Sequence, residues 1–222
     1  MRLRTRSSHQ SRMDKRRQIL EAADRVFRSK GLSKATTREI ARDAGCADGT
    51  LYLHFDDRLA LFSAVLDECV PDIKESLQQL EELVGKRTVR QNLEMVAERY
   101  LNFHKRVLGA VCSIFAEPEL LEAHRAKLRA QGKGPHISQG MLLNYIRAEQ
   151  KIGRVDRHAI PEAMTSMLLG GCFYRVFVSQ YMGEPMHPAP HAFVRKLVDQ
   201  LLRGACPSDL ASDPEPEFSC AD

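Results

Sequence analysis

The sequence lacks the short motifs by which many enzymes hold nucleotides or activate a nucleophile. Its 222 residues contain no G-x-x-x-x-G-K-[ST], G-x-G-x-x-G, H-E-x-x-H or G-x-S-x-G pattern. The histidines after residue 120 are scattered without the paired spacing of a metal site, at His124, His136, His158, His187 and His191. We therefore expect a protein that is not an enzyme and that holds neither a cofactor nor a metal ion.

Paired cysteines and long apolar runs are also missing. The six cysteines, at positions 46, 69, 112, 172, 206 and 220, form no C-x-x-C, which argues against a zinc site and a disulfide framework. The longest apolar run, Met167 to Tyr174, is far shorter than the roughly 20 residues that span a bilayer. The basic amino terminus has no apolar segment after it, so no signal peptide is predicted. We expect a cytoplasmic protein with reduced thiols and no membrane contact.

Charge is distributed unevenly, although the net charge of +4 is modest. Residues 1–17 contain seven basic residues against Asp14 alone, whereas five acidic residues and no basic one follow Cys206. Residues 1–11 are serine-rich without periodicity, which predicts a disordered basic arm; residues 204–222 are predicted to be a disordered acidic tail. The arm could contact phosphates or the minor groove, or be a solvated tail with no role. Arg12, Lys15 and Arg16, near the start of the first helix, could also reach the backbone of a duplex.

Residues 36–58 favour two short helices joined by a tight turn. Thr36 and Glu39 have the spacing of a capping box, and Gly45 can adopt the left-handed backbone that ends a helix. A second short helix is expected over about residues 47–53. An apolar stripe over about residues 13–29 predicts a supporting helix before them. Two short helices joined in this way form a helix-turn-helix, whose second helix enters the major groove of DNA.

The same stretch resembles the amino-terminal module of the tetracycline-repressor (TetR) family. The pattern T-x-x-x-I-A-x-x-A-G-x-x-x-G-T-L-Y-x-x-F-x-x-[KR]-x-x-L is carried here by Thr36 or Thr37, Ile40, Ala41, Ala44, Gly45, Gly49, Thr50, Leu51, Tyr52, Phe55, Arg58 and Leu61. This resemblance implies an all-α fold, with an N-terminal three-helix DNA-binding domain and a C-terminal helical bundle for ligand binding and dimerisation. The module departs from the family at Ala47, a poor N-cap, and at Asp48, which puts the operator sequence in doubt.

The order of patterns along the chain predicts the domain organisation. The helix-turn-helix domain is expected over residues 12–58, a linking helix over 59–71, and a helical ligand-binding and dimerisation domain over 72–203. Within the last domain, helical periodicity runs through about 72–84, 89–108, 118–131, 136–150, 159–182 and 190–203. Glycine and proline clusters separate these segments.

Ten residues of the first domain are predicted to contact DNA. For phosphate contacts, which position a protein, the resemblance favours Thr36, Thr37, Tyr52, His54 and Arg58. For base reading it favours Ala47, Asp48, Gly49 and Thr50, with Arg38 as an outer contact. Gly49 has a physical reason to be small, because a missing side chain lets the helix approach the groove closely. The alternatives are ordinary: Tyr52 in the core, His54 on a solvated surface, and threonines that serve only as caps.

The second domain offers apolar and aromatic side chains with a few isolated polar groups. A ligand cavity between helices is predicted to be lined by Phe103, His104, Phe115, Met141, Tyr145, Met167, Phe173, Arg175 and Phe177. The helix over 159–182 is apolar around much of its circumference and must be buried. It is predicted to pair with the last helix in a homodimer through Met164, Gly171, Val178, Phe193, Leu197 and Leu201. Plain core packing and a monomer are the alternatives.

Together these features predict a homodimeric transcriptional regulator. A two-fold dimer would present two recognition helices to a palindromic operator in double-stranded DNA. We expect a repressor that an unidentified small-molecule effector releases from its operator. The alternative is a ligand-independent regulator or architectural protein whose second domain only dimerises.

Overall fold

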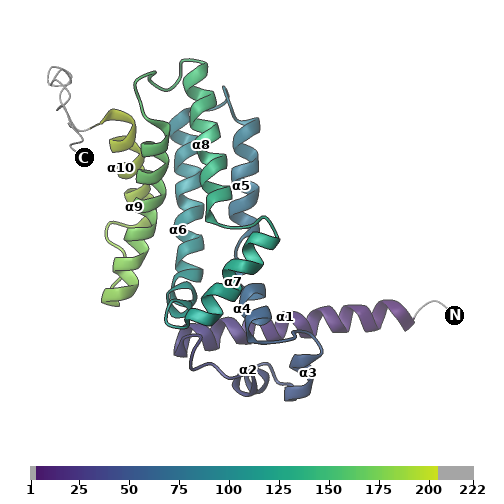
Figure 1. The fold of residues 1–222 in the computed structure, drawn as a ribbon. Coiled ribbons are helices and arrows are strands. Elements are labelled where there is room, and N and C mark those ends of the chain that lie inside the picture. Colours follow the sequence, from purple (N-terminus) through teal and green to yellow (C-terminus); the bar gives the residue numbers. More distant parts are fainter. Residues whose placement is uncertain (1–3, 205–222) are drawn as a thin grey trace, which may run out of the picture.

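The computed structural model describes residues 4–204, and within that range every regular element is an α-helix. The helices are α1 (Arg4–Lys30), α2 (Thr37–Asp43), α3 (Asp48–Tyr52), α4 (Arg58–Asp67), α5 (Pro71–Glu82), α6 (Val89–Ile114), α7 (Pro118–Ala130), α8 (Pro135–Lys151), α9 (Pro161–Met182) and α10 (Pro190–Arg203). Figure 1 shows two parts: a small head of α1–α4 at the base and an upright body of α5–α10. The predicted fold class is confirmed.

The head is a compact helical unit built on α1. Ile19, Ala23 and Phe27 are buried on one side of α1, where they pack with Ile40 of α2 and Leu51 of α3 in one apolar cluster. Thr36 accepts a hydrogen bond from the Glu39 N–H, and the Glu39 carboxylate accepts one from the Thr36 N–H, so the predicted capping box begins α2. The head therefore fixes the orientation of α3 through these apolar contacts and one cap.

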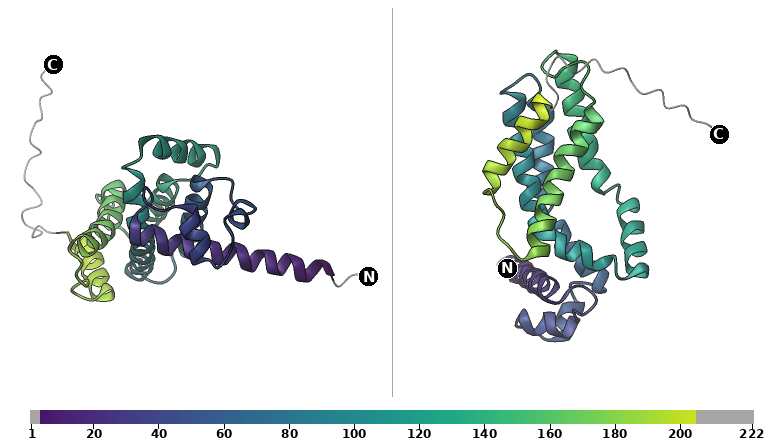
Figure 2. Two further views of the ribbon diagram at one scale, coloured as in Figure 1. Left: turned by 90° about the horizontal axis from the view of Figure 1, so that it is seen from below. Right: turned by 90° about the vertical axis from the view of Figure 1, so that its left-hand side faces the viewer.

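The body is a bundle in which proline starts most of the helices and glycine ends several of them. Proline occupies the first turn of α5, α7, α8, α9 and α10, where its missing N–H costs no hydrogen bond. The α9 helix ends at Gly183, which has a φ of 70°. In the body, α6 packs against α5, α9 and α10, and α8 packs against α5 and α9. The two views in Figure 2 agree with this arrangement.

The long helix α6 belongs to both parts. Leu93, Val96 and Leu101 lie in the core of the body. Ala110 and Ile114, near the C-terminal end of the same helix, lie in the core of the head. The Ser113 hydroxyl also accepts a hydrogen bond from the Leu32 N–H at 3.0 Å. A displacement of α6 within the body would therefore also move the α6 residues that lie in the core of the head.

The structure differs from the sequence prediction at two boundaries. Residues 4–11 continue α1, so the disordered arm predicted over residues 1–11 is wrong for that part; no glycine or proline precedes Gly31 to interrupt the helix. The linking helix predicted over 59–71 is α4, which ends at Asp67, and Pro71 begins α5 instead. The acidic tail predicted over 204–222 lies, beyond Gly204, outside the described residues. None of the helices between Arg4 and Arg203 is long and apolar enough to cross a membrane.

Candidate nucleic-acid interface

The turn between α2 and α3 sets the direction of the recognition helix. Gly45 has a φ of 60°, a left-handed conformation that a side chain would strain. Ile40 and Ala41 on α2 and Leu51 on α3 are buried against α1, so the opposite side of α3 faces outward. The predicted helix-turn-helix is therefore present in the geometry, with α3 as its second helix.

The outward side of α3 carries small and polar residues. Ala47, Asp48 and Gly49 are exposed, and Thr50 is half-buried. A Cβ added at Gly49 would meet no atom within 4 Å, so packing inside the protein does not require glycine there. Ala47 stands at the N-cap of α3 without a side-chain hydrogen bond, as the sequence predicted. Asp48 does not replace it as a cap, because it is the first residue of the helix.

Thr37 and Tyr52, two residues predicted to contact phosphates, are hydrogen-bonded to each other. The Thr37 hydroxyl and the Tyr52 hydroxyl are 3.1 Å apart, which joins the start of α2 to the end of α3. Tyr52 is 53% exposed, so it is a surface residue rather than a core residue. Both hydroxyls lie on the surface of the head, where they could share an acceptor such as a phosphate oxygen. Thr36 is occupied as the N-cap of α2, and its side chain is exposed beside them.

Arg38 and Asp48 lie opposite each other across the same surface. The Arg38 Nε and the Asp48 Oδ2 are 3.9 Å apart, and the two side chains are 89% and 54% exposed. An ion pair at this distance and exposure contributes little stability. The Asp48 charge therefore has a cation nearby, and Arg38 remains free to turn toward an outside acceptor.

His54 follows α3 in a positively charged environment. Burial lowers the pKa of the His54 imidazole, and the nearby charges of Arg12, Arg16 and Lys15 lower this pKa further. The Arg16 guanidinium lies 5.1 Å from the centroid of the adjacent Phe55 ring. Arg12, Lys15 and Arg16 of α1 thus lie close to the end of the recognition helix.

Arg58 is directed away from the outward face of α3. Its guanidinium donates to the Leu32 carbonyl at 3.0 Å and to the Ser33 carbonyl at 3.4 Å. It also forms an ion pair with Glu117, which precedes α7. The structure therefore places Arg58 at the junction between head and body, apart from the other nine residues predicted to contact DNA.

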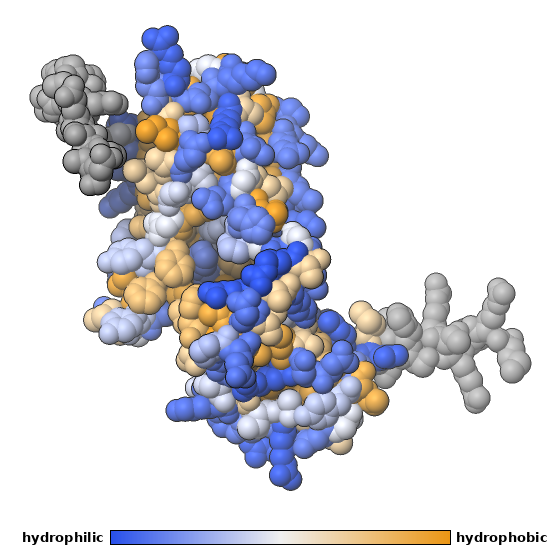
Figure 3. All heavy atoms as spheres, in the orientation of Figure 1, coloured by the Kyte–Doolittle hydropathy of each residue, from blue (hydrophilic) through white to orange (hydrophobic). Residues whose placement is uncertain are grey.

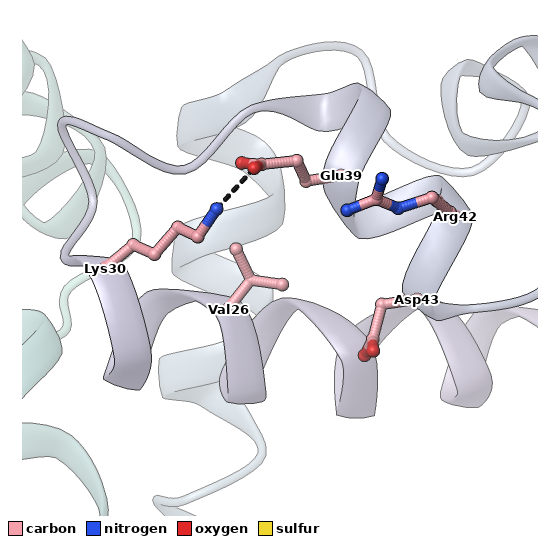
Figure 4. A pocket seen from close by; sticks show the side chains of 5 residues that line it. All are labelled: Val26, Lys30, Glu39, Arg42 and Asp43. Carbon is pink, nitrogen blue, oxygen red and sulfur yellow. Dashed lines mark hydrogen bonds and ion pairs between the residues drawn. The ribbon is translucent and has the colours of Figure 1, made fainter.

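A surface hollow of about 300 Å³ lies between α1 and α2, lined by Val26, Lys30, Glu39, Arg42 and Asp43. Figure 4 shows Lys30 and Glu39 joined across it. Asp43 pairs with Arg25 of α1 at 2.8 Å. These ion pairs hold α2 against α1. The hollow therefore results from the packing of α2 on α1.

The residues predicted to line a ligand cavity in the body separate into two groups. His104 lies in an aromatic cluster between α6 and α9, with ring centroids 5.3 Å from Phe103 and 5.5 Å from Phe173. Phe177 stacks on Phe173 at 6.2 Å. Burial lowers the pKa of His104 to about 4. The structure thus brings together four of the nine residues: Phe103, His104, Phe173 and Phe177.

The other five residues lie elsewhere. Tyr145 is 1% exposed and accepts a hydrogen bond from Asn92 at 2.8 Å, so it is an ordinary core residue. Phe115, just after α6, and Met167, on α9, are 63% and 62% exposed. Arg175 donates to the Pro188 carbonyl and lies over the Phe193 ring. Met141 is half-buried against the core of the body.

The residues predicted for a dimer interface mainly join α9 to α10 within one protomer. Met164 is 7% exposed in the core of the body. A Cβ added at Gly171 would lie 3.1 Å from the Leu197 side chain, so these helices already touch there. Phe193 and Leu201 pack against the same core, and Val178 is half-buried.

A different set of α9 residues faces outward. Met167, Tyr174, Phe177 and Tyr181 are 62%, 68%, 39% and 79% exposed. Together with the exposed Gly170 they repeat at alternating intervals of three and four residues, which is the spacing of a helix-pairing seam. We call these five residues the α9 stripe. In Figure 3 apolar surface gathers on α9 near the head, whereas the head is mostly hydrophilic. The seven-residue spacing of Met167, Tyr174 and Tyr181 was the sequence signal for this set.

The fold and the outward α2–α3 unit define a helix-turn-helix protein with a separate helical body. Comparison with known proteins narrows this class. Residues 19–65 match the family model described as bacterial regulatory proteins, tetR family. The head of this chain is therefore a DNA-binding domain of the tetR-family type.

Curated relatives match mainly in the head. The HTH-type transcriptional regulator TtgR of Pseudomonas putida is 37% identical over 62 residues, which are 28% of this chain and 30% of TtgR. The HTH-type transcriptional activator FasR of Mycolicibacterium smegmatis is 35% identical over 92 residues, 41% of each chain. The aligned segments therefore span less than half of these relatives.

Solved structures match over nearly the whole fold at low identity. The fatty acid degradation regulator FadR from Bacillus halodurans superposes with a TM-score of 0.65 at 19% identity, covering 86% of this chain and 95% of that one. FadR from Bacillus subtilis, in complex with stearoyl-CoA, gives 0.62 at 18% identity, covering 85% and 98%. At such identities the likeness concerns the fold alone.

Proposed function

We propose that this chain is a sequence-specific DNA-binding transcriptional regulator that reads its operator with α3. The observation that carries this proposal is the outward face of α3, where Asp48 and Gly49 are exposed beside the hydrogen-bonded Thr37 and Tyr52. The otherwise unexplained glycine supports a close approach to the groove, because a Cβ at position 49 would meet nothing in the protein. In this proposal Ala47, Asp48, Gly49 and Thr50 meet base edges.

The other residues predicted to contact DNA, apart from Arg58, bind the DNA backbone in this proposal. Thr36, Thr37, Tyr52 and His54 contact phosphates, and Arg38 is an outer contact. The neutral imidazole of His54 suits donation of one hydrogen bond to a phosphate oxygen. Arg58 serves a different purpose in this proposal: it holds the head against the body through Glu117.

The protein acts as a two-fold homodimer held by the α9 stripe. Aromatic side chains that are 39% to 79% exposed are costly to leave in water and are enriched in the buried centres of protein interfaces. A symmetric pair of such stripes would place two heads on the same side of the assembly. A palindromic operator follows from that symmetry.

The body also receives a small-molecule effector that lowers the affinity for the operator. Support comes from the aromatic cluster of Phe103, His104, Phe173 and Phe177 beside α6, since α6 enters the core of the head. A ligand that prefers one position of α6 would shift the population of heads that fit the operator. We propose repression as the sign of control, because occupancy of a promoter suffices for it. The protein works in the cytoplasm.

The test is a selection of bound genomic fragments with purified protein at defined salt. Recovery of one palindromic motif is the expected result. Salt-sensitive binding without a motif would contradict the proposal and favour an architectural protein. Thermal shift with a panel of apolar compounds, including the stearoyl-CoA held by the Bacillus subtilis FadR structure, then tests the effector. A compound that stabilises the protein should also release the recovered operator; stabilisation without release favours the ligand-independent alternative.

A further inference from the structure

The N-terminal half of α1 extends beyond the core of the head. The helix begins at Arg4, yet none of its side chains described between Arg12 and Gln18 is buried, and the core starts at Ile19. At a rise of about 1.5 Å per residue, some 20 Å of helix precedes the core. Figures 1 and 2 show this segment running past α3 on the side opposite α9 and α10. Packing inside the protein does not account for such a projection.

The basic residues of α1 differ along the helix in how many carboxylates lie near them. From Arg17 onward, cations are matched with carboxylates: Arg17 with Glu21, Arg25 with Asp43, Arg28 with Asp24 and Lys30 with Glu39. By contrast, Arg12, Lys15 and Arg16 are three cations in a five-residue stretch that contains one carboxylate, Asp14. These three residues lie at i, i+3 and i+4, which places them on one face of the helix, where like charges repel. We call them the α1 basic face.

The α1 basic face lies beside the end of the recognition helix. The Arg16 guanidinium is 5.1 Å from the ring centroid of Phe55, three residues after α3. All three cations are close enough to His54 to lower the pKa of its imidazole, after the larger effect of burial. A duplex held by α3 would therefore bring its phosphates close to a stretch of α1 in which three cations outnumber the one carboxylate, Asp14.

We propose that the α1 basic face binds backbone phosphates of the operator just outside the half-site that α3 reads. This inference rests on the proposed function and adds a second contact to it. Phosphates would relieve the repulsion among Arg12, Lys15 and Arg16 and release condensed counterions. Because phosphates are the same at every base pair, this contact strengthens binding without changing the preferred sequence.

The direction of α1 predicts where the added contact falls. The helix runs from the head away from α9 and α10, the side on which the proposed partner lies. In the dimer both α1 helices would therefore point to the outer ends of the palindrome. Protection of the DNA backbone should extend past each outer end and should not increase between the half-sites.

The experiment compares full-length protein with the triple variant R12Q/K15Q/R16Q. The matched control is K74Q/K86Q/K151Q, which removes three exposed positive charges from the body instead. Each protein is titrated at several salt concentrations onto two duplexes. One is the recovered palindrome alone and the other carries ten added base pairs on each side. Hydroxyl-radical footprints are recorded on the longer duplex, and circular dichroism checks that each variant is folded.

For wild type and the control we expect tighter binding to the longer duplex and footprints beyond the palindrome. For R12Q/K15Q/R16Q we expect those flanking footprints to vanish. The salt slope should fall by about 0.9 for each phosphate that the variant no longer neutralises, up to three per head. The recovered motif should stay the same. If the protein binds the palindrome, but neither the added flanking base pairs nor the triple substitution changes its affinity or footprint, this inference alone is overturned. A wild type without sequence preference overturns the proposed function and this inference together.

Discussion

The outward faces of α3 and α9 are both exposed, yet they are built for different partners. The α3 face presents Ala47, Asp48 and Gly49, which are small or polar and leave room for a close approach. The α9 stripe presents Tyr174, Tyr181 and other large side chains, up to 79% exposed. Small residues suit a rigid, charged and grooved surface, whereas large aromatic residues suit burial against an apolar one. The difference teaches that exposure alone does not identify an interface; the size and polarity of the exposed side chains do.

The strongest test of the difference between these two faces is a charged residue placed in the α9 stripe. We expect Y174D to convert the dimer to a monomer, because two-fold symmetry buries the new carboxylate twice and each copy costs at least about 2 kcal/mol. Sedimentation velocity should then give the mass of one chain, and operator affinity should fall about 1000-fold, which corresponds to about 4 kcal/mol.

The control for Y174D is I152D, the same kind of change at an isoleucine that is 51% exposed but outside the stripe. It should leave both the mass and the operator affinity unchanged. A dimeric Y174D variant would show that the stripe is not the interface.

The stripe also marks the limit of what the sequence could predict. Several helix boundaries followed from local chemistry: the Thr36 cap, Gly45, and the glycine and proline clusters between the later helices. Pro71 was the exception, because it was expected to end a helix and begins α5 instead. The rotation of α9 did not follow, because this helix is apolar on nearly every side and its periodicity leaves the inward face ambiguous. Met164 therefore looked like an interface residue, although it is buried in the core of the body.

Arg58 shows a second limit. Its place in the family pattern pointed to DNA, but its partner Glu117 lies 59 residues further along the chain. Only the three-dimensional packing of α7 beside α4 brings the two side chains together. Interactions between residues so far apart leave no periodic signal in one sequence.

The aromatic cluster behind the stripe makes the body sensitive to pH. Burial lowers the pKa of His104 to about 4 in the folded chain, compared with 6.5 for an unperturbed imidazole. The unfolded chain therefore binds more protons between these two values, so stability is full above about pH 6.5 and is lost as the pH falls toward 4. The expected loss is at most about 3 kcal/mol.

Urea denaturation of wild type and H104Q at several pH values measures this contribution. The free energy of unfolding should fall less steeply in H104Q between pH 6.5 and 4. H158Q, a change at an exposed histidine, should follow the wild-type profile. Parallel profiles for wild type and H104Q would mean that the imidazole is not desolvated.

A side chain at position 49 tests the head side of the comparison. We expect G49L to weaken operator binding about tenfold or more, because the added side chain would fill the space through which α3 approaches the groove. Stability should rise by up to about 1 kcal/mol, since leucine is a better helix former than glycine. The control is G109L, at an exposed helical glycine whose Cβ also meets nothing within 4 Å; it should gain stability and keep its DNA affinity. Normal operator binding by G49L would remove the argument that Gly49 faces the groove.

The smallest expected effect lies where the two regions meet. Arg58 and Glu117 are 32% and 21% exposed, so their ion pair is partly shielded from water. We expect E117Q to lower the free energy of unfolding by about 1 kcal/mol, because Arg58 keeps its bonds to the Leu32 and Ser33 carbonyls and loses only its counter-charge.

A double-mutant cycle with R58M separates the pair from each residue's other contacts. The coupling should appear in stability, and operator affinity of E117Q should stay close to wild type at temperatures well below its midpoint. If R58M weakened DNA binding as much in the E117Q background as in wild type, Arg58 would be a DNA contact after all. In our interpretation the ion pair joins the polar head to the aromatic body. Its coupling free energy then measures how strongly a conformational change in one part is transmitted to the other.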